Sequence, residues 1–339
     1  MTTRRKFIRR SASAAAAALA ISVLAACGGG TAPEAGPAES GGPFPVTIKN
    51  VFGETTIEQQ PQRIVTLGWN AQDVVYALGQ TPVGMPSYAY GANKDGVMPW
   101  TAEHYKSSET TLLDTADGPP YEEILSLEPD VILAPYEGFD DAAYNKLSEI
   151  APTVAYPDKA WQTSWQDQTT IIGKAIGKTD EAEKLVEETT QKIAAAAEQH
   201  PEFAGKTVSV PYFGKQLINV YKPTDPRVQL LNELGFRNAP GVEKIVRESK
   251  DENFYADVAW EKVNQVDADV IVGYVDDMSI EEFHKNDLTR QLGAVKNHSA
   301  LILDDTQVIA GLSQPSVLSV DWTLEKILPE LSKAANGEL

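Results

Sequence analysis

The sequence predicts an α/β protein in which two Rossmann-like lobes are joined by one long rigid helix and enclose a ligand cleft. Two observations lead to this prediction. A helix followed by a buried strand occurs twice, at residues 122–135 and 261–274, in segments that align without a gap. Between the copies, residues 180–199 carry apolar side chains at helical spacing with charges in the gaps. Alternating helices and buried strands are typical of α/β lobes with parallel sheets.

The N-terminus has the pattern of a signal peptide that ends before the only cysteine of the chain. Residues 1–26 combine a basic start with a short apolar stretch, which is too short and too weakly apolar for a settled transmembrane helix. The run Leu-Ala-Ala-Cys ending at Cys27 resembles a bacterial lipobox, which implies that Cys27 is acylated. Residues 3–9 also resemble a twin-arginine signal, so the export route stays open. A plain secretory signal or a buried N-terminal helix is the alternative.

Composition sets the organisation of the remaining chain. Residues 27–45 have almost no apolar side chains to bury and are predicted to form a flexible tether. Without residues 1–26 the chain carries 24 basic and 48 acidic side chains, a formal charge of −24, which argues against nucleic acid as a partner. A single cysteine excludes an intrachain disulfide. The rest suffices for two domains, at residues 46–162 and 201–339, with a helical connection at residues 163–200.

Both predicted lobes begin with similar elements. Residues 63–67 and 206–210 are apolar strand patterns that lead into a loop and a helix. The two helices end just before Gly79 and Gly235, where glycine can adopt the left-handed cap conformation. The sequence Asp-Val-Ile in each copy of the repeat is expected to form a buried parallel strand. Because βαβ units also look alike by chance, the kinship of the two halves is a hypothesis.

A single helix is predicted over residues 180–199. Thr179 is a suitable N-cap, and His200 followed by Pro201 ends the helical pattern. Twenty residues at 1.5 Å per residue span about 30 Å, roughly the diameter of one domain. Such a helix can hold two lobes at a nearly fixed separation.

Taken together, these features resemble the periplasmic binding proteins of ABC importers for ferric siderophores, haem and cobalamin. The resemblance covers nearly all of residues 46–333, with landmarks at residues 61–67, 127–133, 150–161 and 322–329. The closest likeness is to the ferric-siderophore members. It implies a substrate-binding lipoprotein, not an enzyme, that delivers a ferric siderophore to its permease. The ligand would bind between the lobes at the carboxyl ends of the strands, as ligands of open α/β sheets do in general.

The loops expected at that edge are rich in aromatic side chains. An iron–siderophore complex is coordinatively full, so its binder needs flat apolar walls and a few hydrogen-bond donors rather than direct metal ligands. No cofactor is expected besides this ligand. The candidate wall residues are Trp69, Tyr88, Tyr90, Trp100, Tyr136, Tyr212, Phe213 and Tyr274.

The sequence leaves the charge class of the siderophore open. A ferric catecholate is strongly anionic and would need arginines, and Arg237 and Arg247 enter the candidate site for this reason. The loops of the first half are nearly uncharged, which suits a neutral hydroxamate complex or a mixed one. Further basic candidates in the second half are Arg227, Lys244, Lys250 and Arg290.

The repeat also suggests a docking surface. The resemblance implies that one acidic residue on each lobe pairs with arginines of the permease, and Glu122 and Glu261 stand at the matching positions. A purely local role is the alternative, because a glutamate in the first turn of a helix is stabilised by the helix dipole. The expected partners are therefore the ligand and a permease dimer with its ATPase subunits. A monomer is expected on the outer face of the cytoplasmic membrane, which it contacts only through the lipid anchor.

Several other functions are weighed against this prediction. A binder of bare zinc or manganese would need converging ligands, and the four histidines are far apart in the sequence. Haem and cobalamin remain alternatives within the same transporter class, since one tyrosine or histidine can ligate haem iron. The chain has no nucleophile elbow or phosphate-binding loop, so no enzyme is predicted. A surface lipoprotein without transport function is the remaining alternative.

Overall fold

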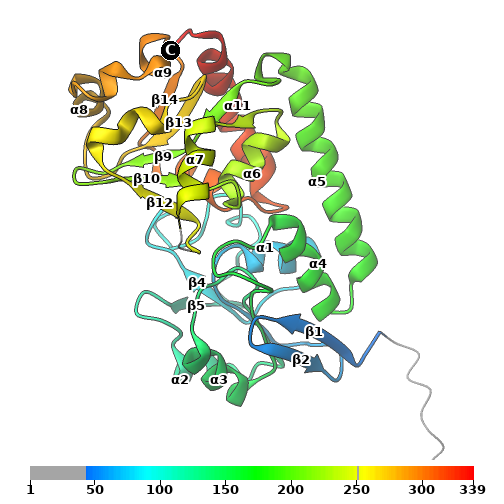
Figure 1. Ribbon diagram of the computed structural model, residues 1–339. Helices are drawn as coiled ribbons and strands as arrows, with labels where there is room; N and C mark the ends of the chain where they lie inside the picture. The colour runs from blue at the N-terminus through cyan, green and yellow to red at the C-terminus, as the bar shows by residue number, and fades with distance from the viewer. Residues whose placement is uncertain (1–42, 250–251) are drawn as a thin grey trace, which may run out of the picture. The chain divides into compact units, whose positions relative to one another are not determined.

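The computed structural model describes residues 43–249 and 252–339, so Cys27, the signal and most of the tether lie outside the described residues. Within these two ranges, no helix is both long enough and apolar enough to cross a bilayer. The described chain begins with an antiparallel hairpin of β1 (Val46–Asn50) and β2 (Gly53–Ile57) (Figure 1).

The first half of the chain contains a five-stranded parallel sheet with the strand order β5-β4-β3-β6-β7. Its inner strands β3 and β6 are short apolar runs that are buried along their whole length, as parallel strands covered by helices must be. The strands are β3 (Ile64–Thr66), β4 (Gly84–Ser87), β5 (Thr111–Asp114), β6 (Val131–Leu133) and β7 (Thr153–Val154). The helices are α1 (Ala71–Ala77), α2 (Tyr121–Ser126), α3 (Asp141–Ile150) and α4 (Trp165–Ala175).

The second half contains a seven-stranded mixed sheet with the order β11-β8-β13-β9-β10-β12, in which β14 also pairs with β13. The strands are β8 (Thr207–Ser209), β9 (Pro211–Phe213), β10 (Ile218–Tyr221), β11 (Arg237–Asn238), β12 (Tyr255–Val258), β13 (Val270–Tyr274) and β14 (Ala300–Leu303). The helices are η1 (Pro201–Phe203), α6 (Pro226–Glu233), α7 (Pro240–Glu248), η2 (Trp260–Val266), α8 (Ile280–Lys285), η3 (Thr289–Gln291), α9 (Gly293–Lys296), α10 (Thr306–Ser313) and α11 (Ser319–Asn336).

The long connecting helix is confirmed as α5 (Thr179–Gln199), which contacts α4 of the first half and α6 and α11 of the second (Figure 1). Its last residue is Gln199, so the helix stops before His200, as predicted. Its start is one residue earlier than expected: Lys178 is the N-cap residue and Thr179 is already helical, so the prediction of a Thr179 cap was wrong. An ion pair of 2.6 Å between Lys192 and Asp321 joins α5 to α11.

The two copies of the repeat both end in a buried parallel strand, β6 and β13, but they begin differently. The first begins with the α-helix α2, whereas the second begins with the 3-10 helix η2, in which Lys262 has non-helical dihedral angles. Val263 and Val266 are still buried, because residues three apart lie on one face of a 3-10 helix. The predicted glycine caps are confirmed, with a φ of 75° at Gly79 and 106° at Gly235.

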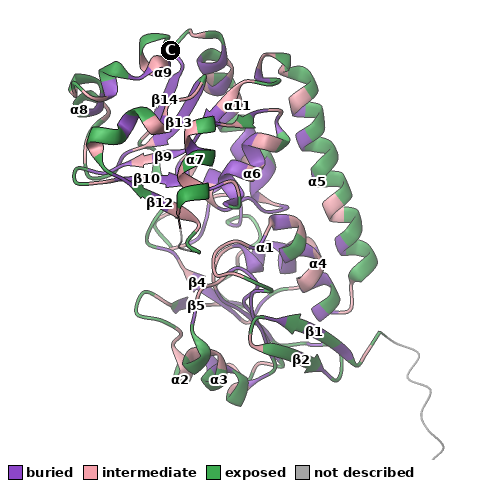
Figure 2. Cartoon of the chain, in the orientation of Figure 1, coloured by how far each residue is buried: buried purple, intermediate pink, exposed green. Residues whose placement is uncertain are grey.

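Burial follows the two sheets, whose strands are largely buried, while the outer face of α5 is exposed (Figure 2). Ile124 and Leu147 fill the core beside the first sheet, and Phe213 and Phe283 fill the core beside the second. Each sheet thus has an apolar core of its own, and a larger cluster that contains Val131 of β6 and Val270 of β13 connects the two halves.

Candidate functional site

A cavity of about 340 Å³ lies at the carboxyl ends of strands from both sheets. Trp69 follows β3, Tyr136 follows β6, and Tyr274 ends β13. This volume is within the range of small-molecule sites. The lining residues are Trp69, Tyr90, Tyr136, Trp161, Tyr221, Arg227, Phe254, Tyr274, Asp276, Ile309, Ala310, Ser313 and Gln314.

The indole of Trp69 is a fixed wall of this cavity. Its ring stacks on Tyr88, with centroids 4.9 Å apart and planes within 10°. The backbone carbonyl oxygen of Trp69 accepts a hydrogen bond of 2.9 Å from Nε2 of Gln168. The preceding Gly68 has a φ of 73° and passes so close to the carbonyl of Tyr136 that a Cβ atom would collide with it. A glycine is therefore required at this point of the loop after β3, which brings Trp69 to the cavity.

Tyr136 and Trp161 form a second wall. Their rings meet edge to face, with centroids 6.0 Å apart. Trp161 lies directly over Gly138, where any Cβ atom would collide with the indole nitrogen. Burial raises the pKa of the Tyr136 hydroxyl, so this group is a neutral hydrogen-bond donor at physiological pH.

Arg227, from the second half of the chain, brings a buried positive charge to the lining. Its guanidinium lies 3.6 Å from the ring centroid of Tyr221, and its Nη1 donates a hydrogen bond of 3.0 Å to the hydroxyl of Tyr274. Nε lies 2.8 Å from Oδ1 of Asp225 without the alignment of a hydrogen bond, so the pair is an ion contact. Asp225 is the N-cap of α6, and burial raises its pKa to about 6 although the arginine opposes this.

Tyrosine hydroxyls and one carboxylate complete the polar part of the lining. The hydroxyls of Tyr221 and Tyr274 are hydrogen-bonded to each other. Asp276, two residues beyond the end of β13, accepts a hydrogen bond of 2.6 Å from the hydroxyl of Tyr212. Burial and the nearby Asp276 raise the pKa of Tyr90 to about 12, so this phenol is also neutral.

A buried carboxylate behind the cavity connects the two halves. Asp73 of α1 accepts hydrogen bonds from Trp100 Nε1 at 2.8 Å, Thr101 Oγ1 at 2.7 Å and Ser316 Oγ at 2.7 Å. Ser316 lies between α10 and α11, so this network connects the first sheet's helices to the C-terminal segment. Burial raises the pKa of Asp73 to about 6, against the effect of its three donors. Nearby, Asn70 donates to the carbonyl of Gln314.

The structure brings four of the candidate residues into the lining, namely Trp69, Tyr90, Tyr136 and Tyr274. Three others are outside the lining and contact Trp69, Asp73 and Asp276 instead. Tyr88 supports Trp69, Trp100 binds Asp73, and Tyr212 orients Asp276.

Three candidates are corrected by their placement. Phe213 is fully buried in the core of the second half and is not available to a ligand. Arg237 lies exposed in the edge strand β11, and Arg247 is on the surface of α7 within 3.8 Å of Glu243. Neither arginine contributes to the lining.

Sequence reasoning missed several lining residues. Arg227 was one of several basic candidates, and the Asp-Pro-Arg run at its position indicates only a capped helix start. Trp161 belonged to a landmark of the family resemblance but was not assigned to the site. Ser313 and Gln314 precede a proline at a helix end and carry no signal of ligand contact.

Glu137, next to the Tyr136 wall, gives a pH-dependent prediction. Desolvation raises its pKa to about 7 from an ordinary value of 4.5. The folded state therefore carries an unfavourable charge above pH 7, and this penalty fades as the pH falls to 4.5. Glu137→Gln should stabilise the fold by about 1–3 kcal/mol at pH 8 and by almost nothing near pH 4.5. Thermal melts across this range would test it, with Glu149→Gln, an exposed glutamate of α3, as control. An equal gain at both pH values would contradict the assignment.

Two other features bear on the kind of site. Among the described residues, no group of three or more histidine, cysteine, aspartate or glutamate side chains could hold a metal ion.

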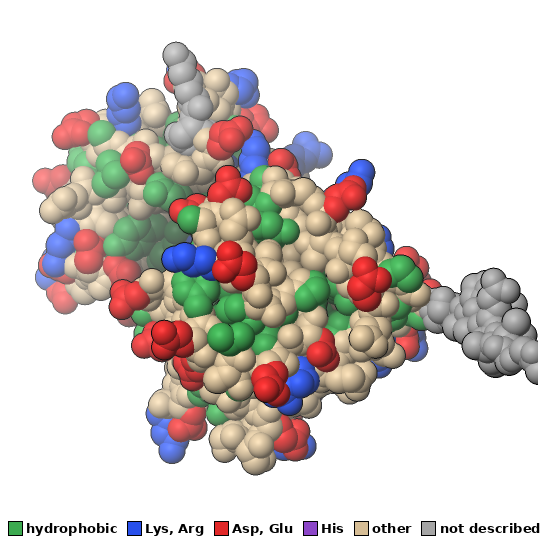
Figure 3. All heavy atoms as spheres, turned by 90° about the horizontal axis from the view of Figure 1, so that it is seen from below, with side chains coloured by type: hydrophobic (Ala, Val, Ile, Leu, Met, Phe, Trp, Pro, Cys, Tyr) green, Lys and Arg blue, Asp and Glu red, His purple; other side chains and the backbone are tan. Residues whose placement is uncertain are grey.

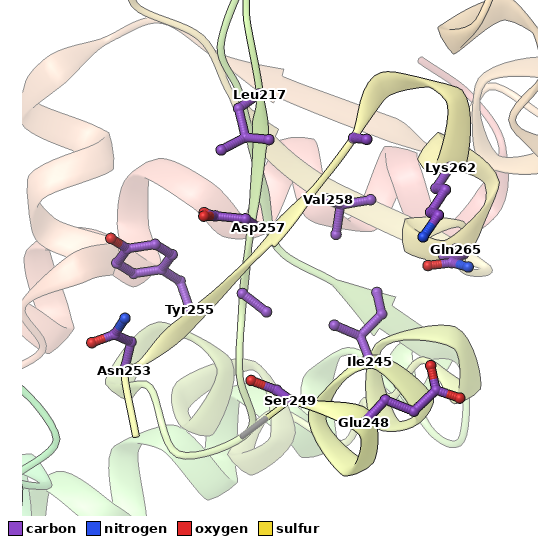
Figure 4. Close-up of a pocket in the computed structure, with 12 residues that line it drawn as sticks. Leu217, Ile245, Glu248, Ser249, Asn253, Tyr255, Asp257, Val258, Lys262 and Gln265 are labelled. Carbon is purple, nitrogen blue, oxygen red and sulfur yellow. The ribbon is translucent and has the colours of Figure 1, made fainter. Parts of the chain in front are cut away.

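A larger hollow of about 540 Å³ lies between α7, β12 and η2 (Figure 4). Its described lining residues come from the second half, at the sheet edge formed by β12, and Tyr255 is the only aromatic residue among them. It lacks the facing aromatic walls of the smaller cavity.

Comparisons with known proteins show what the chain is similar to. A family model described as periplasmic binding protein matches residues 64–306. The Fe(3+)-citrate-binding protein YfmC of Bacillus subtilis is 27% identical over 74% of this chain and 75% of its own length. PiaA of Streptococcus pneumoniae, solved in complex with ferrichrome, is 34% identical, with a TM-score of 0.78 over 86% of this chain and 99% of its own. SirA of Staphylococcus aureus, solved with staphyloferrin B, is 27% identical, with a TM-score of 0.69 over 84% of this chain and 98% of its own.

Proposed function

Because the chain belongs to the periplasmic binding protein family, we propose that it is the substrate-binding protein of an ABC importer and captures a ferric siderophore. Its role is binding and delivery, not catalysis. The observation that carries this proposal is the cavity at the strand ends, lined by Trp69, Tyr136 and Trp161 of the first half and by Tyr221, Tyr274 and Arg227 of the second.

The chemistry of the lining supports a chelated metal over a bare one. Flat rings can cover the organic shell of a siderophore, and neutral phenols and a guanidinium can donate hydrogen bonds to its iron-binding oxygens. The names of the relatives favour the same ligand over haem or cobalamin. They include the probable siderophore-binding lipoprotein YfiY of Bacillus subtilis, 25% identical over 85% of this chain.

A fluorescence titration tests the proposal. Trp69 and Trp161 line the cavity, so a bound iron complex should quench their emission. The protein without residues 1–26 is titrated with a ferric hydroxamate, a ferric catecholate, ferric citrate, hemin and cobalamin. We expect saturable one-to-one quenching by at least one ferric siderophore. A response to hemin or cobalamin alone would move the assignment to those ligands, and no response at all would favour a surface lipoprotein without transport function.

Removal of the Trp69 wall should weaken binding strongly. Trp69→Ala deletes a large, rigid ring at the centre of the contact, so we expect affinity for the ferric siderophore to fall by about 10- to 100-fold. The Kd is measured by equilibrium dialysis with radioactive iron. Trp260→Phe is the matched control, because this indole donates to the carbonyl of Gly214 outside the cavity. A loss below threefold in Trp69→Ala would argue that the ligand binds elsewhere.

The location follows from the family and from the N-terminal pattern. The protein acts outside the cytoplasmic membrane, and the lipobox-like sequence supports an anchor at Cys27. Mass spectrometry of the N-terminal peptide should find a diacylglyceryl group on this cysteine, and a free thiol on the mature protein would contradict the anchor. Permease docking through Glu122 and Glu261 completes the proposed function.

A further inference from the structure

The charges around the cavity indicate which class of siderophore it accepts, an inference that rests on the proposed function. We propose that the cavity selects a neutral ferric trihydroxamate and discriminates against anionic ferric catecholates and citrates, with Asp276 as the residue that sets this preference. Three hydroxamates carry one negative charge each and neutralise Fe(III). Three catecholates carry two each and leave a net charge of −3.

The positive charge in the lining is already compensated. Arg227 is the only basic residue that lines the cavity in the described chain, and its Nε lies 2.8 Å from the buried Asp225. One face of its guanidinium is covered by Tyr221. An anionic ligand would therefore compete with a carboxylate that the fold has already placed there. A neutral ligand needs only the remaining hydrogen-bond donors of the guanidinium.

Two other lysines lie outside the lining of the cavity. Lys159 lies 3.3 Å from Glu252 and outside the lining. Lys222 is buried and also lies outside the lining. No other lysine or arginine of the described residues belongs to the wall that a ligand would touch.

The uncompensated charge at the cavity is negative. Asp276 lines the cavity, is exposed to solvent, and makes no ion pair within the described residues. The Tyr212 hydroxyl holds its carboxylate in place at 2.6 Å. Asp305, the N-cap of α10, adds a second carboxylate close enough to raise the pKa of Tyr90.

The net charge of the whole chain also disfavours anionic ligands. The chain has 48 acidic and 29 basic side chains, a formal charge of −19. Acidic side chains are spread over the face of the molecule that Figure 3 shows. A field of this sign slows the approach of anions and leaves neutral ligands unaffected.

The test compares three probes of different charge. Ferrichrome serves as the neutral trihydroxamate, ferric enterobactin as the trianionic catecholate, and ferric dicitrate as the anionic carboxylate. We expect the Kd of ferrichrome to be at least 100-fold lower than those of the two anions. Equal or tighter binding of either anion would overturn the inference while leaving the proposed function intact. Failure of all three to bind would overturn the proposed function itself.

A variant separates the effect of the Asp276 charge from the shape match between ligand and cavity. Asp276→Asn keeps the side-chain size and should improve binding of ferric enterobactin by about tenfold, because the trianion no longer meets a fixed charge. Ferrichrome affinity should change much less than enterobactin affinity, because a neutral complex has no net charge to interact with the carboxylate. Asp257→Asn removes the same charge from the same half but outside the cavity lining, so selectivity should not change. An unchanged affinity for enterobactin in Asp276→Asn would remove this residue from the mechanism.

Salt gives a second readout for the same variant. The repulsion between Asp276 and a trianion is screened as ionic strength rises from 0.01 M to 0.1 M, where the screening length falls from about 30 Å to about 10 Å. Enterobactin binding by the native protein should therefore strengthen with salt, and by less in Asp276→Asn. An equal response of both proteins would contradict a direct effect of the carboxylate.

Discussion

Arg227→Met should destabilise the protein by about 3–5 kcal/mol, because it leaves the Asp225 carboxylate buried without a counter-ion. Asp225 has no exposed surface, and burial already raises its pKa to about 6 in the presence of the arginine. The variant also loses the guanidinium that lies over Tyr221 and donates to Tyr274. Urea unfolding at pH 8 measures the loss of stability.

The pH dependence of this loss has a defined sign. Without the arginine, the pKa of Asp225 should rise further above its unfolded value of 3.8. The folded state then binds a proton that the unfolded state lacks, so stability is regained as the pH falls from 8 towards 4. We expect the difference from the native protein to be largest at pH 8. A variant within 1 kcal/mol of the native protein at pH 8 would show that Asp225 is not desolvated as the structure indicates.

A double variant separates stability from ligand binding. Asp225→Asn with Arg227→Met removes both charges, and replacing a buried ion pair by neutral groups is often close to neutral for stability. We expect the double variant to regain most of the stability lost by Arg227→Met. Its affinity for the siderophore should remain reduced, because the hydrogen-bond donors of the guanidinium are absent. Recovery of both properties would assign Arg227 a purely structural role.

Glu122→Ala together with Glu261→Ala should abolish iron uptake and leave ligand affinity unchanged. Both glutamates are exposed, both lie in the first turn of their helices α2 and η2, and neither forms an ion pair among the described residues. Leu125, one turn along α2, is 57% exposed, which suits a surface that another protein covers. Two free carboxylates at equivalent places of the repeat could pair with arginines of a permease.

Uptake of radioactive iron by cells that carry the double variant measures this effect, and fluorescence titration measures affinity. Glu183→Ala with Glu198→Ala is the matched control, because these are two exposed glutamates of α5. The control should transport normally. Normal uptake in Glu122→Ala/Glu261→Ala would reduce both residues to a local role at their helix starts.

Local patterns predicted much of the fold and part of the site. The repeat at residues 122–135 and 261–274 places a strand at the same point of each half, and parallel strands end at the same edge of their sheet. For this reason Tyr136 and Tyr274, which follow or end the repeat strands, could be proposed from the sequence, as could Trp69 after the strand at residues 63–67. All three line the cavity.

The sequence patterns did not show which side chains of a strand face the cavity. Tyr212 and Phe213 are neighbours in β9, and neighbouring residues of a strand point to opposite faces. The two side chains therefore cannot face the same cavity. Phe213 is buried in the core, and the hydroxyl of Tyr212 donates to Asp276. Trp100 was also proposed for the site because it is aromatic and carries a hydrogen-bond donor. In the structure its indole nitrogen donates to Asp73 instead.

The sequence by itself determined the fold class, the two strand-bearing halves and the long helix between them, because hydrophobic period, glycine caps and proline stops act over a few residues. Only the tertiary structure decided which charged side chains meet at the cavity. Arg227 became the cavity arginine, while Arg237 and Arg247 stayed at the surface, because burial depends on how helices and strands distant in the sequence pack together. The charge balance of the cavity depends in turn on Asp225 and Asp276, which lie 51 residues apart and act together only in the folded chain.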